Sequence, residues 1–225
     1  MANKVLLMCG ILSPVLYAIS DVLAGMQWAG YSFRDQTISE LAAVGAPSRP
    51  LFPVLLFIVY GLMLAFGVGI WMASPENRRL RVVGGLVVCV GVMALTVGQL
   101  APMRLRGTEQ GFSGTMHLLE GMVAMLMTFT AMGIAANAFG AHFRVYTIAT
   151  IVLALGFGAW AGLEAPRIEQ GLATPWVGVK ERIFWYGYQS WYIVLALRLL
   201  CKRVEARAVR KTRIDSSSHA SRRTA

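Results

Sequence analysis

The sequence carries little charge for its length. Only 14% of its 225 residues are charged, whereas 56% are hydrophobic. A soluble domain of this size places its apolar residues in stripes and carries charge on about a quarter of its positions. The composition therefore excludes an ordinary soluble globular protein.

Cysteine is also scarce, and several catalytic motifs are absent. The three thiols, Cys9, Cys89 and Cys201, are each expected toward the cytoplasmic end of a helix, where reducing conditions exclude a disulfide framework. No Walker loop, Gly-x-Ser-x-Gly elbow, His-Glu-x-x-His motif or dinucleotide fingerprint occurs. These absences exclude several enzyme classes, and no cofactor is expected.

Histidine is too sparse for a zinc centre made of three imidazoles. His142 and His219 are expected on the opposite side of the membrane from His117. A mixed site built from Asp21, His117 and Glu120 is the less favoured alternative. The sequence therefore predicts no metal site.

Long hydrophobic runs fill most of the chain, and a bilayer core needs roughly 20 apolar residues per helix. Six runs come close to that length: Val5–Gly25, Leu51–Ala73, Val82–Ala101, Leu118–Phe139, Val145–Leu163 and Ile183–Leu200. The prediction is an all-α, polytopic membrane protein, a bundle of six transmembrane helices. We expect residues 1–200 to form this single domain.

The basic residues predict the orientation of the bundle. With six spans, one side holds Lys4, Arg78, Arg79, Arg81, Arg144 and the C-terminal cluster 202–223. The other side holds Arg34, Arg49, Arg104, Arg106, Arg167, Lys180 and Arg182. The positive-inside rule then places both termini in the cytoplasm, in a multi-pass protein of the plasma or inner membrane.

Residues 201–225 form a basic tail that we expect to be disordered. Basic residues near a membrane surface attract anionic head groups by about 1 kcal/mol each, so anionic lipids are an expected partner of the tail. Despite the net charge of +10, nucleic acid is not an expected partner, because no aromatic or groove-reading element accompanies the charge.

The first external loop, residues 26–50, contains a predicted short amphipathic helix. Thr37 and Glu40 have the spacing of a capping box, and Gly45 with Pro47 ends the pattern. Such a helix would lie at the outer membrane–water interface with its apolar face toward the bilayer. Asp35 and Glu40 are interpreted as cap and first-turn acids rather than as a catalytic carboxylate pair.

Glycine recurs every seven residues in the third run, at Gly84, Gly91 and Gly98. Small residues in line along a membrane helix allow a second helix to approach closely. We therefore expect a packing surface here rather than a ligand site.

Polar residues inside the runs are the candidate site. Each costs about 2.5–3.5 kcal/mol in a membrane helix, so each needs an explanation. All are expected on the outer side, and we predict one external polar pocket formed by Asp21, Gln99, Arg104, His117, Glu120, Glu164 and Arg167, with Arg106 close by. For Asp21 and Glu164, interfacial ion pairs that hold down the loops are an equally good explanation.

His117 and Glu120 are the pair for which function is favoured. They lie three residues apart and therefore on one face of a helix. A buried carboxylate beside an imidazole can exchange protons with it. The pair is a candidate for ligand binding or acid–base chemistry.

The segment Gly30–Pro47, placed after a first run that contains Asp21, resembles the bacterial membrane family known as domain of unknown function 998. The Ala-Pro after the third run, His117, and Glu181-Arg182-Ile183 leading to Trp191 are similar too. The resemblance covers roughly residues 5–200 and implies six membrane helices. It implies no activity, substrate or catalytic residue.

Three functions remain open. The first is binding or transport of a small molecule or lipid head group in the external pocket. The second is catalysis on a lipid-linked substrate at the outer leaflet, with Glu120 or Asp21 as base and His117 as its partner. The third is a structural subunit that stabilises a partner. The first is preferred, so the sequence favours a function other than catalysis.

Overall fold

The computed structural model describes the backbone of residues 2–221 and the side chains of residues 3–202. Within them all regular secondary structure is helical, apart from one isolated β-bridge between Val44 and Arg104. The elements are α1 (Ala2–Gln27), η1 (Ser39–Ala42), α2 (Phe52–Ala73), α3 (Arg78–Leu100), α4 (Gly111–Ala135), α5 (Ala141–Gly162), α6 (Ala165–Glu169) and α7 (Val177–Ser221).

Among the residues that the structure describes, five helices are long and apolar enough to cross a membrane, namely α1, α2, α3, α4 and the stretch Ala141–Glu169 that includes α5. The chain is therefore a multi-pass membrane protein. The sixth predicted run, Ile183–Leu200, lies within α7, which is not among the five. Tryptophan, tyrosine, Gln189 and Arg198 make this run less hydrophobic than the others.

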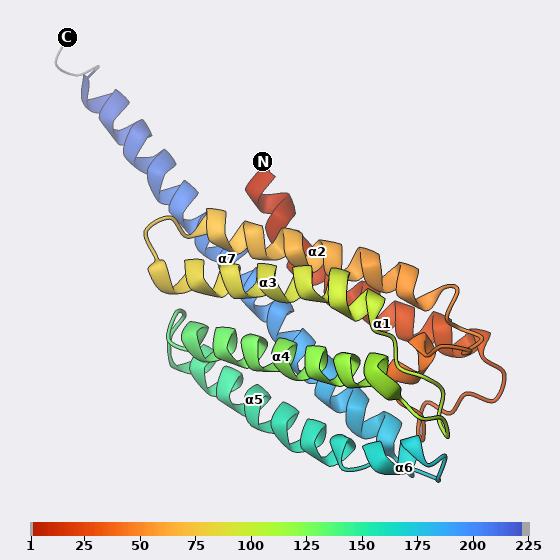
Figure 1. Cartoon of the computed structure of the whole chain (residues 1–225). Coiled ribbons are helices and arrows are strands. Elements are labelled where there is room, and N and C mark those ends of the chain that lie inside the picture. The colour runs from red at the N-terminus through yellow and green to blue at the C-terminus, as the bar shows by residue number, and fades with distance from the viewer. Residues whose placement is uncertain (1, 222–225) are drawn as a thin grey trace.

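The long helices follow one another around the bundle (Figure 1). α1, α2, α3 and α4 each pack against the next helix in sequence, and α7 packs against both α1 and α5. The contact between α4 and α5 is the weakest of these. We call the end that holds residues 28–51, residues 101–110, α6 and the start of α7 the loop-1 end, and the opposite end the basic end.

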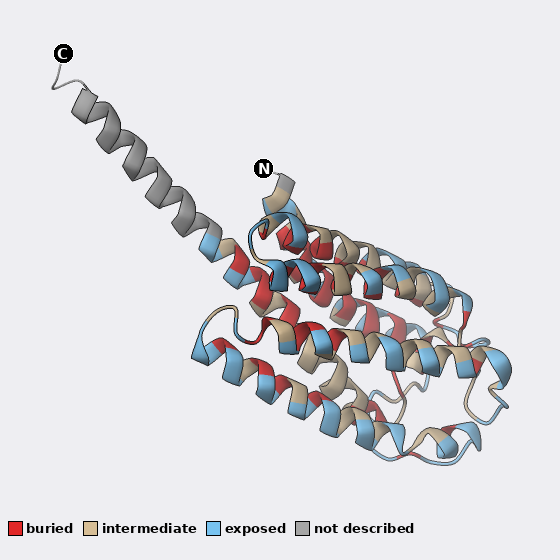
Figure 2. Cartoon of the chain, turned by 60° about the vertical axis from the view of Figure 1, so that its left-hand side comes forward, coloured by how far each residue is buried: buried red, intermediate tan, exposed pale blue. Residues whose placement is uncertain are grey.

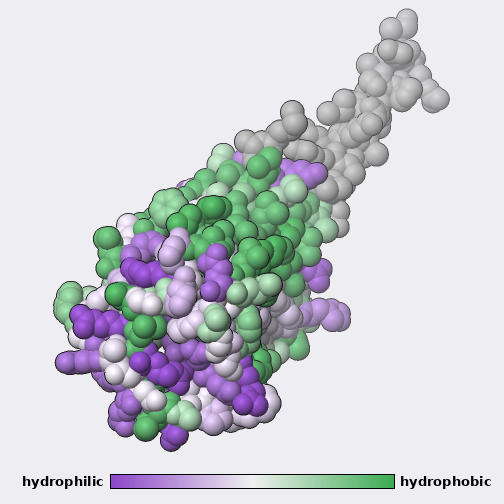
Figure 3. All heavy atoms as spheres, turned by 90° about the vertical axis from the view of Figure 1, so that its right-hand side faces the viewer, coloured by the Kyte–Doolittle hydropathy of each residue, from purple (hydrophilic) through white to green (hydrophobic). Residues whose placement is uncertain are grey.

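The surface of the bundle fits a membrane environment. Figure 3 looks onto the loop-1 end and shows hydrophilic residues gathered there, while the sides of the bundle are mostly hydrophobic. Large apolar side chains such as Val145, Val152 and Leu126 are exposed on these sides. Lipid rather than water is the natural neighbour of such a surface.

The glycines of α3 confirm the predicted packing surface at two of three positions. A Cβ on Gly84 would lie 2.8 Å from the backbone oxygen of Gly67 in α2. A Cβ on Gly91 would lie 3.0 Å from Cβ of Leu64. The third glycine, Gly98, instead faces the Glu120 side chain of α4. The first two positions therefore determine how closely α2 and α3 approach.

Two clusters of buried side chains stabilise the bundle. The larger lies toward the basic end around Trp191 and Tyr192 of α7, and the smaller lies under residues 28–51 around Tyr17, Leu41 and Phe52. In α4 the buried residues gather toward the basic end, at Thr128, Ala131, Met132 and Ala135, whereas residues 115–127 are all exposed or intermediate (Figure 2). The interior is thus unevenly filled along its length.

Helix boundaries differ from the hydrophobic runs in α7, which begins at Val177 and continues to Ser221, and in α4, which begins at Gly111 rather than near Leu118. The start of α4 is the difference at the loop-1 end that concerns Glu120. The first residues of α4 are small and polar, so hydrophobicity does not mark them, although their backbone continues the helix. In the first loop, η1 is a single 3-10 turn of four residues. The predicted disordered basic tail, residues 201–225, lies largely outside the residues whose side chains the structure describes.

Candidate functional site

Three consecutive ionisable residues at the start of α7 organise the loop-1 end. Successive residues of an α-helix point about 100° apart, so Lys180, Glu181 and Arg182 leave the helix in three directions. Lys180 contacts Glu164, which directly precedes α6. Arg182 contacts Asp21 in α1. Glu181 accepts hydrogen bonds from the turn that contains η1.

Arg182 and Asp21 form a bidentate ion pair between α7 and α1. Nε of Arg182 lies 2.8 Å from Oδ2 of Asp21, and Nη2 lies 2.8 Å from Oδ1. The Asp21 side chain is 1% exposed, and Tyr186 also donates a hydrogen bond to it. This geometry satisfies a carboxylate that would otherwise be costly inside the bundle.

The same guanidinium holds the first loop. Nη1 of Arg182 donates to the backbone oxygens of Phe33 at 2.8 Å, Gln36 at 3.2 Å and Gly178 at 3.1 Å. Nη2 also donates to the Tyr31 hydroxyl at 2.8 Å. All five N–H donors of the side chain are therefore used. Arg182 connects α1, the loop and α7 at one point.

The spacing of Thr37 and Glu40 correctly predicted a capping box. The Glu40 carboxylate accepts from the Thr37 backbone N–H at 2.8 Å, and the Thr37 hydroxyl accepts from the Glu40 backbone N–H at 3.2 Å. The turn they close is η1. Glu40 is completely buried, which a cap at an exposed interface would not require.

The partner of Glu40 is Arg106, from the connection between α3 and α4. Nε and Nη2 of Arg106 each lie 3.0 Å from a Glu40 carboxylate oxygen. The remaining donors reach the backbone oxygens of Leu172 and Asp35 and the hydroxyl of Thr174. This second guanidinium joins the first loop, the connection between α3 and α4, and the connection between α6 and α7. Again all five donors are used.

Glu164 forms a third ionic contact, between the end of α5 and α7. Its Oε1 lies 3.0 Å from Nζ of Lys180, and its Oε2 lies 3.5 Å from Nε of Arg167. The Lys180 ammonium also lies 4.5 Å from the centre of the Trp160 ring. Arg167 is half exposed and donates to the backbone oxygen of Ala173.

Glu120 differs from these acids. Its carboxylate carbon lies 3.6 Å from the place that a Cβ on Gly98 of α3 would take. Among the described residues it has no ion pair and no hydrogen bond, although it is only half exposed. It lies nine residues after the helix start at Gly111, about two and a half turns along α4.

His117, one turn before Glu120, is also unsatisfied. Its Nδ1 is buried and has no hydrogen-bond partner within residues 3–202. No hydrogen bond joins it to Glu120 in that range. Gln99 near the end of α3 is half buried, and Arg104 is exposed.

The seven predicted residues thus lie in different surroundings. Asp21 pairs with Arg182, and Glu164 pairs with Lys180 and Arg167. The others, Gln99, Arg104, His117 and Glu120, have no ionic partner in the described residues. No group of three or more His, Cys, Asp or Glu side chains in that part of the chain could hold a metal ion.

Sequence reasoning missed the basic partners. The sequence identifies Arg182 and Lys180 only as outer-side charges, whereas they pair with Asp21 and Glu164. Arg106 is expected to be able to pair with the acids of the pocket, but its partner is Glu40 of the first loop. One signal was available for the first two. They lie directly before the last run, where a basic side chain can reach an acid near the outer end of a neighbouring helix.

The comparison with family models gives one match, which covers residues 11–198 and is described as "Protein of unknown function (DUF998)". The chain belongs to the DUF998 family. The search of curated proteins and the search of solved structures found no match. Membership confirms the resemblance inferred from the sequence.

The DUF998 match includes every ionic contact of the loop-1 end as well as His117 and Glu120. The segments that carry the resemblance also contact one another. Asp21 pairs with Arg182, and Glu181 accepts hydrogen bonds from Ile38 and Ser39. The segments on which the sequence resembles the family therefore lie side by side at the point where the first loop is fastened onto α1 and α7.

Glu181 predicts a pH dependence of stability. Its side chain is half exposed by area, but protein surrounds the carboxylate, and burial raises its pKa to about 7 despite the hydrogen bonds from Ile38 and Ser39. A pKa that is higher in the folded state stabilises the folded state at low pH. This contribution is lost as the pH rises through about 7.

Wild type should therefore lose stability between about pH 5 and 8 relative to Glu181→Gln. Thermal unfolding in mild detergent across this range measures the difference. Glu109→Gln, a change at an exposed acid, is the control and should follow the wild-type curve. Parallel curves for Glu181→Gln and wild type would contradict the prediction.

Proposed function

We propose that this DUF998 protein crosses the plasma or inner membrane six times and binds an amine-bearing small molecule or lipid head group. The site would lie toward the loop-1 end between α3 and α4 on one side and α5 and α7 on the other, with Glu120 as its charged anchor. The single observation that carries the proposal is an acid inside a membrane helix without a partner in the described residues.

The six-span topology follows from length and charge. The segment Ile183–Leu200 is apolar enough for a helix that other helices shield, and Trp191 and Tyr192 within it are buried. The basic end holds Arg78, Arg79, Arg81 and Arg144, which supports a cytoplasmic location for both termini. The loop-1 end then faces outward.

The proposed site coincides with a poorly filled part of the bundle. No residue of α4 between Gly114 and Thr128 is buried, and none of α5 after Ala154. α3 has none after Ala94, and in α7 every residue from 181 to 188 is intermediate. Packed interiors normally leave few gaps, so half-exposed facing residues here indicate room for an additional molecule.

The chemistry of Glu120 selects the ligand. A carboxylate in a membrane helix is costly, and Asp21, Glu40 and Glu164 of the loop-1 end each have a basic partner. A ligand with an ammonium group would supply the missing charge.

The two other functions receive less support. An acid–base pair for catalysis needs His117 and Glu120 within hydrogen-bond reach, and no such bond joins them in the described residues. A purely structural role accounts for the ion pairs of Asp21, Glu40 and Glu164. It does not account for Glu120, which has no ion pair and no hydrogen bond in the described part of the chain.

Mass spectrometry of molecules that co-purify with the protein in mild detergent tests the proposal. A charge-assisted hydrogen bond contributes about 1.5–3 kcal/mol, so Glu120→Gln should reduce retention of an amine-bearing species about tenfold or more. His117→Ala measures what the neighbouring imidazole adds.

Glu109→Gln removes an exposed acid from the adjoining connection and should retain as much ligand as wild type. Equal retention by Glu120→Gln would exclude Glu120 as the anchor. A co-purifying protein with no small molecule would favour the structural function instead.

A further inference from the structure

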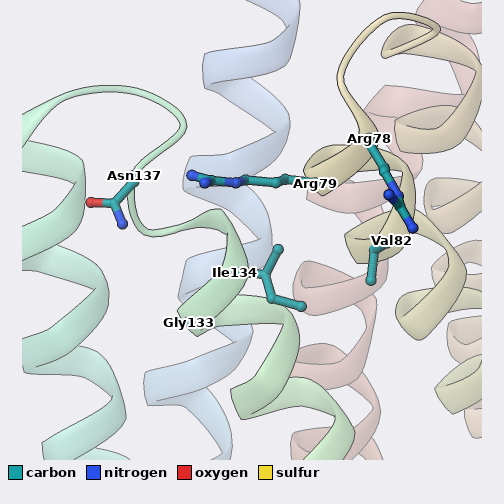
Figure 4. Close-up of a pocket in the computed structure, with 6 residues that line it drawn as sticks. All are labelled: Arg78, Arg79, Val82, Gly133, Ile134 and Asn137. Carbon is teal, nitrogen blue, oxygen red and sulfur yellow. The ribbon is translucent and has the colours of Figure 1, made fainter.

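The basic end contains a cleft whose charge is opposite to that of Glu120. This cleft of about 590 Å³ opens between the start of α3 and the end of α4, a size typical of small-molecule sites, which span about 300–1,000 Å³. Its lining residues are Arg78, Arg79, Val82, Gly133, Ile134 and Asn137 (Figure 4). It is far along the bundle from Glu120 and does not depend on the function proposed above.

The two arginines of the cleft are available for a ligand. Both are exposed, and neither forms an ion pair or side-chain hydrogen bond with any residue in the range 3–202. The neighbouring acid Glu76 pairs with neither of them in that range. The cleft therefore concentrates positive charge that nothing in the described chain neutralises.

Other arginines at the same end are already engaged. Arg81 lies over the Trp71 ring, 4.7 Å from its centre, and Arg144 donates to Asn137 at 3.2 Å. Figure 4 shows the Arg79 side chain extending from α3 toward the connection between α4 and α5. The Arg79 guanidinium thus extends across the cleft, whereas the Arg78 side chain runs along α3 toward Val82. Arg144 binds Asn137, which also lines the cleft.

The lower part of the cleft is apolar. Val82 and Ile134 face each other across the gap between α3 and α4, below the Arg79 side chain in Figure 4. Thr130 and Leu126, one and two helical turns before Ile134 in α4, are exposed on the same face. An alkyl chain can follow this face into the bilayer.

We infer that the cleft binds an anionic phospholipid, with its phosphate between Arg78 and Arg79 and an acyl chain along Val82 and Ile134. Guanidinium groups bind phosphate oxygens strongly, and the N-terminus of α3 adds partial positive charge at the same place. The apolar lining selects a lipid over a free anion. The lipid comes from the leaflet that meets the basic end.

Lipid retention by the full-length protein in mild detergent tests the site, with phosphatidylglycerol and phosphatidylcholine of identical acyl chains as probes. The double change Arg78→Gln and Arg79→Gln should weaken phosphatidylglycerol binding about 25-fold, or about fivefold per guanidinium. Phosphatidylcholine should bind weakly to both proteins.

The control removes the same charge from the same end by changing Lys4 and Arg81 to Gln, neither of which lines the cleft or forms a side-chain hydrogen bond with its lining in the described residues, and it should bind phosphatidylglycerol like wild type. If both double variants lose the lipid equally, the attraction is general and the site is refuted. Retention at the wild-type level by the Arg78 and Arg79 variant would also refute it.

A change in the apolar lining separates a lipid from a free anion. Val82→Trp fills the cleft without altering charge and should lower phosphatidylglycerol binding. Inorganic phosphate at millimolar concentration should not displace the lipid. Displacement by phosphate, or unaltered lipid binding by Val82→Trp, would overturn the assignment of the cleft to a phospholipid.

Discussion

Arg182→Met is expected to lower the free energy of unfolding by about 3–5 kcal/mol, the usual cost of leaving a buried charge without its partner. The Asp21 carboxylate is 1% exposed and loses both of its 2.8 Å contacts. The backbone oxygens of Phe33 and Gln36 lose a donor at the same time. Reversible unfolding in mixed detergent micelles measures the change.

A matched control distinguishes burial from ion pairing as such. Arg34 and Asp35 also form an ion pair, at 2.9 Å, but the Arg34 side chain is 60% exposed. Exposed pairs contribute about 0–1 kcal/mol, so Arg34→Ala should have little effect. Similar losses for Arg34→Ala and Arg182→Met would mean that Arg182 does not organise the loop-1 end.

The double variant Asp21→Leu and Arg182→Met tests whether Arg182 also holds the first loop. An ion pair exchanged for apolar side chains often costs little. Here only part of the stability should return, because the backbone oxygens of Phe33, Gln36 and Gly178 still lack their donor. Full recovery would show that the loop contacts contribute nothing.

Local patterns predicted local structure well. The hydrophobic runs identified the long helices because a membrane helix must satisfy a length requirement that composition alone reveals. The spacing of Thr37 and Glu40 predicted a capping box because both partners lie within one turn. Neither inference needed knowledge of a distant segment.

Partners distant in sequence were not predicted. Glu40 and Arg106 are separated by 66 positions and meet only because residues 28–51 fold over the connection between α3 and α4. Asp21 and Arg182 are separated by 161 positions. A costly buried acid implies some partner, but its identity depends on which helices become neighbours, and that follows from packing.

The glycines of α3 show the same distinction. Their seven-residue spacing predicts one continuous packing surface, yet the structure gives the two ends different neighbours. Gly84 lies against the backbone of α2, whereas Gly98 lies against a flexible carboxylate. Sequence periodicity places both on one stripe of the helix but cannot show which helix, if any, packs there.

Gly84→Ala is therefore expected to lower the free energy of unfolding by about 1–3 kcal/mol. The new Cβ would lie 2.8 Å from the Gly67 oxygen and 2.8 Å from the Trp71 backbone nitrogen, and backbone atoms cannot move aside as a side chain can. α2 and α3 must separate to admit it. Reversible unfolding of the variant in mixed detergent micelles measures the loss.

Gly98→Ala is the control within the same helix. Its Cβ would meet the Glu120 carboxyl carbon at 3.6 Å, an ordinary contact, and alanine favours a helix over glycine by about 1 kcal/mol. Stability should stay constant or rise. Equal losses for Gly84→Ala and Gly98→Ala would show that helix approach is not limiting at Gly84.

Combining Gly67→Ala with Gly84→Ala tests the geometry directly, because each Cβ would meet the backbone of the other helix at the same crossing. Once the first methyl group has separated the two helices, the second meets less resistance. The double variant should therefore cost less than the sum of the single changes. Strict additivity would mean that the two methyl groups act at independent places, contrary to the observed crossing of α2 and α3.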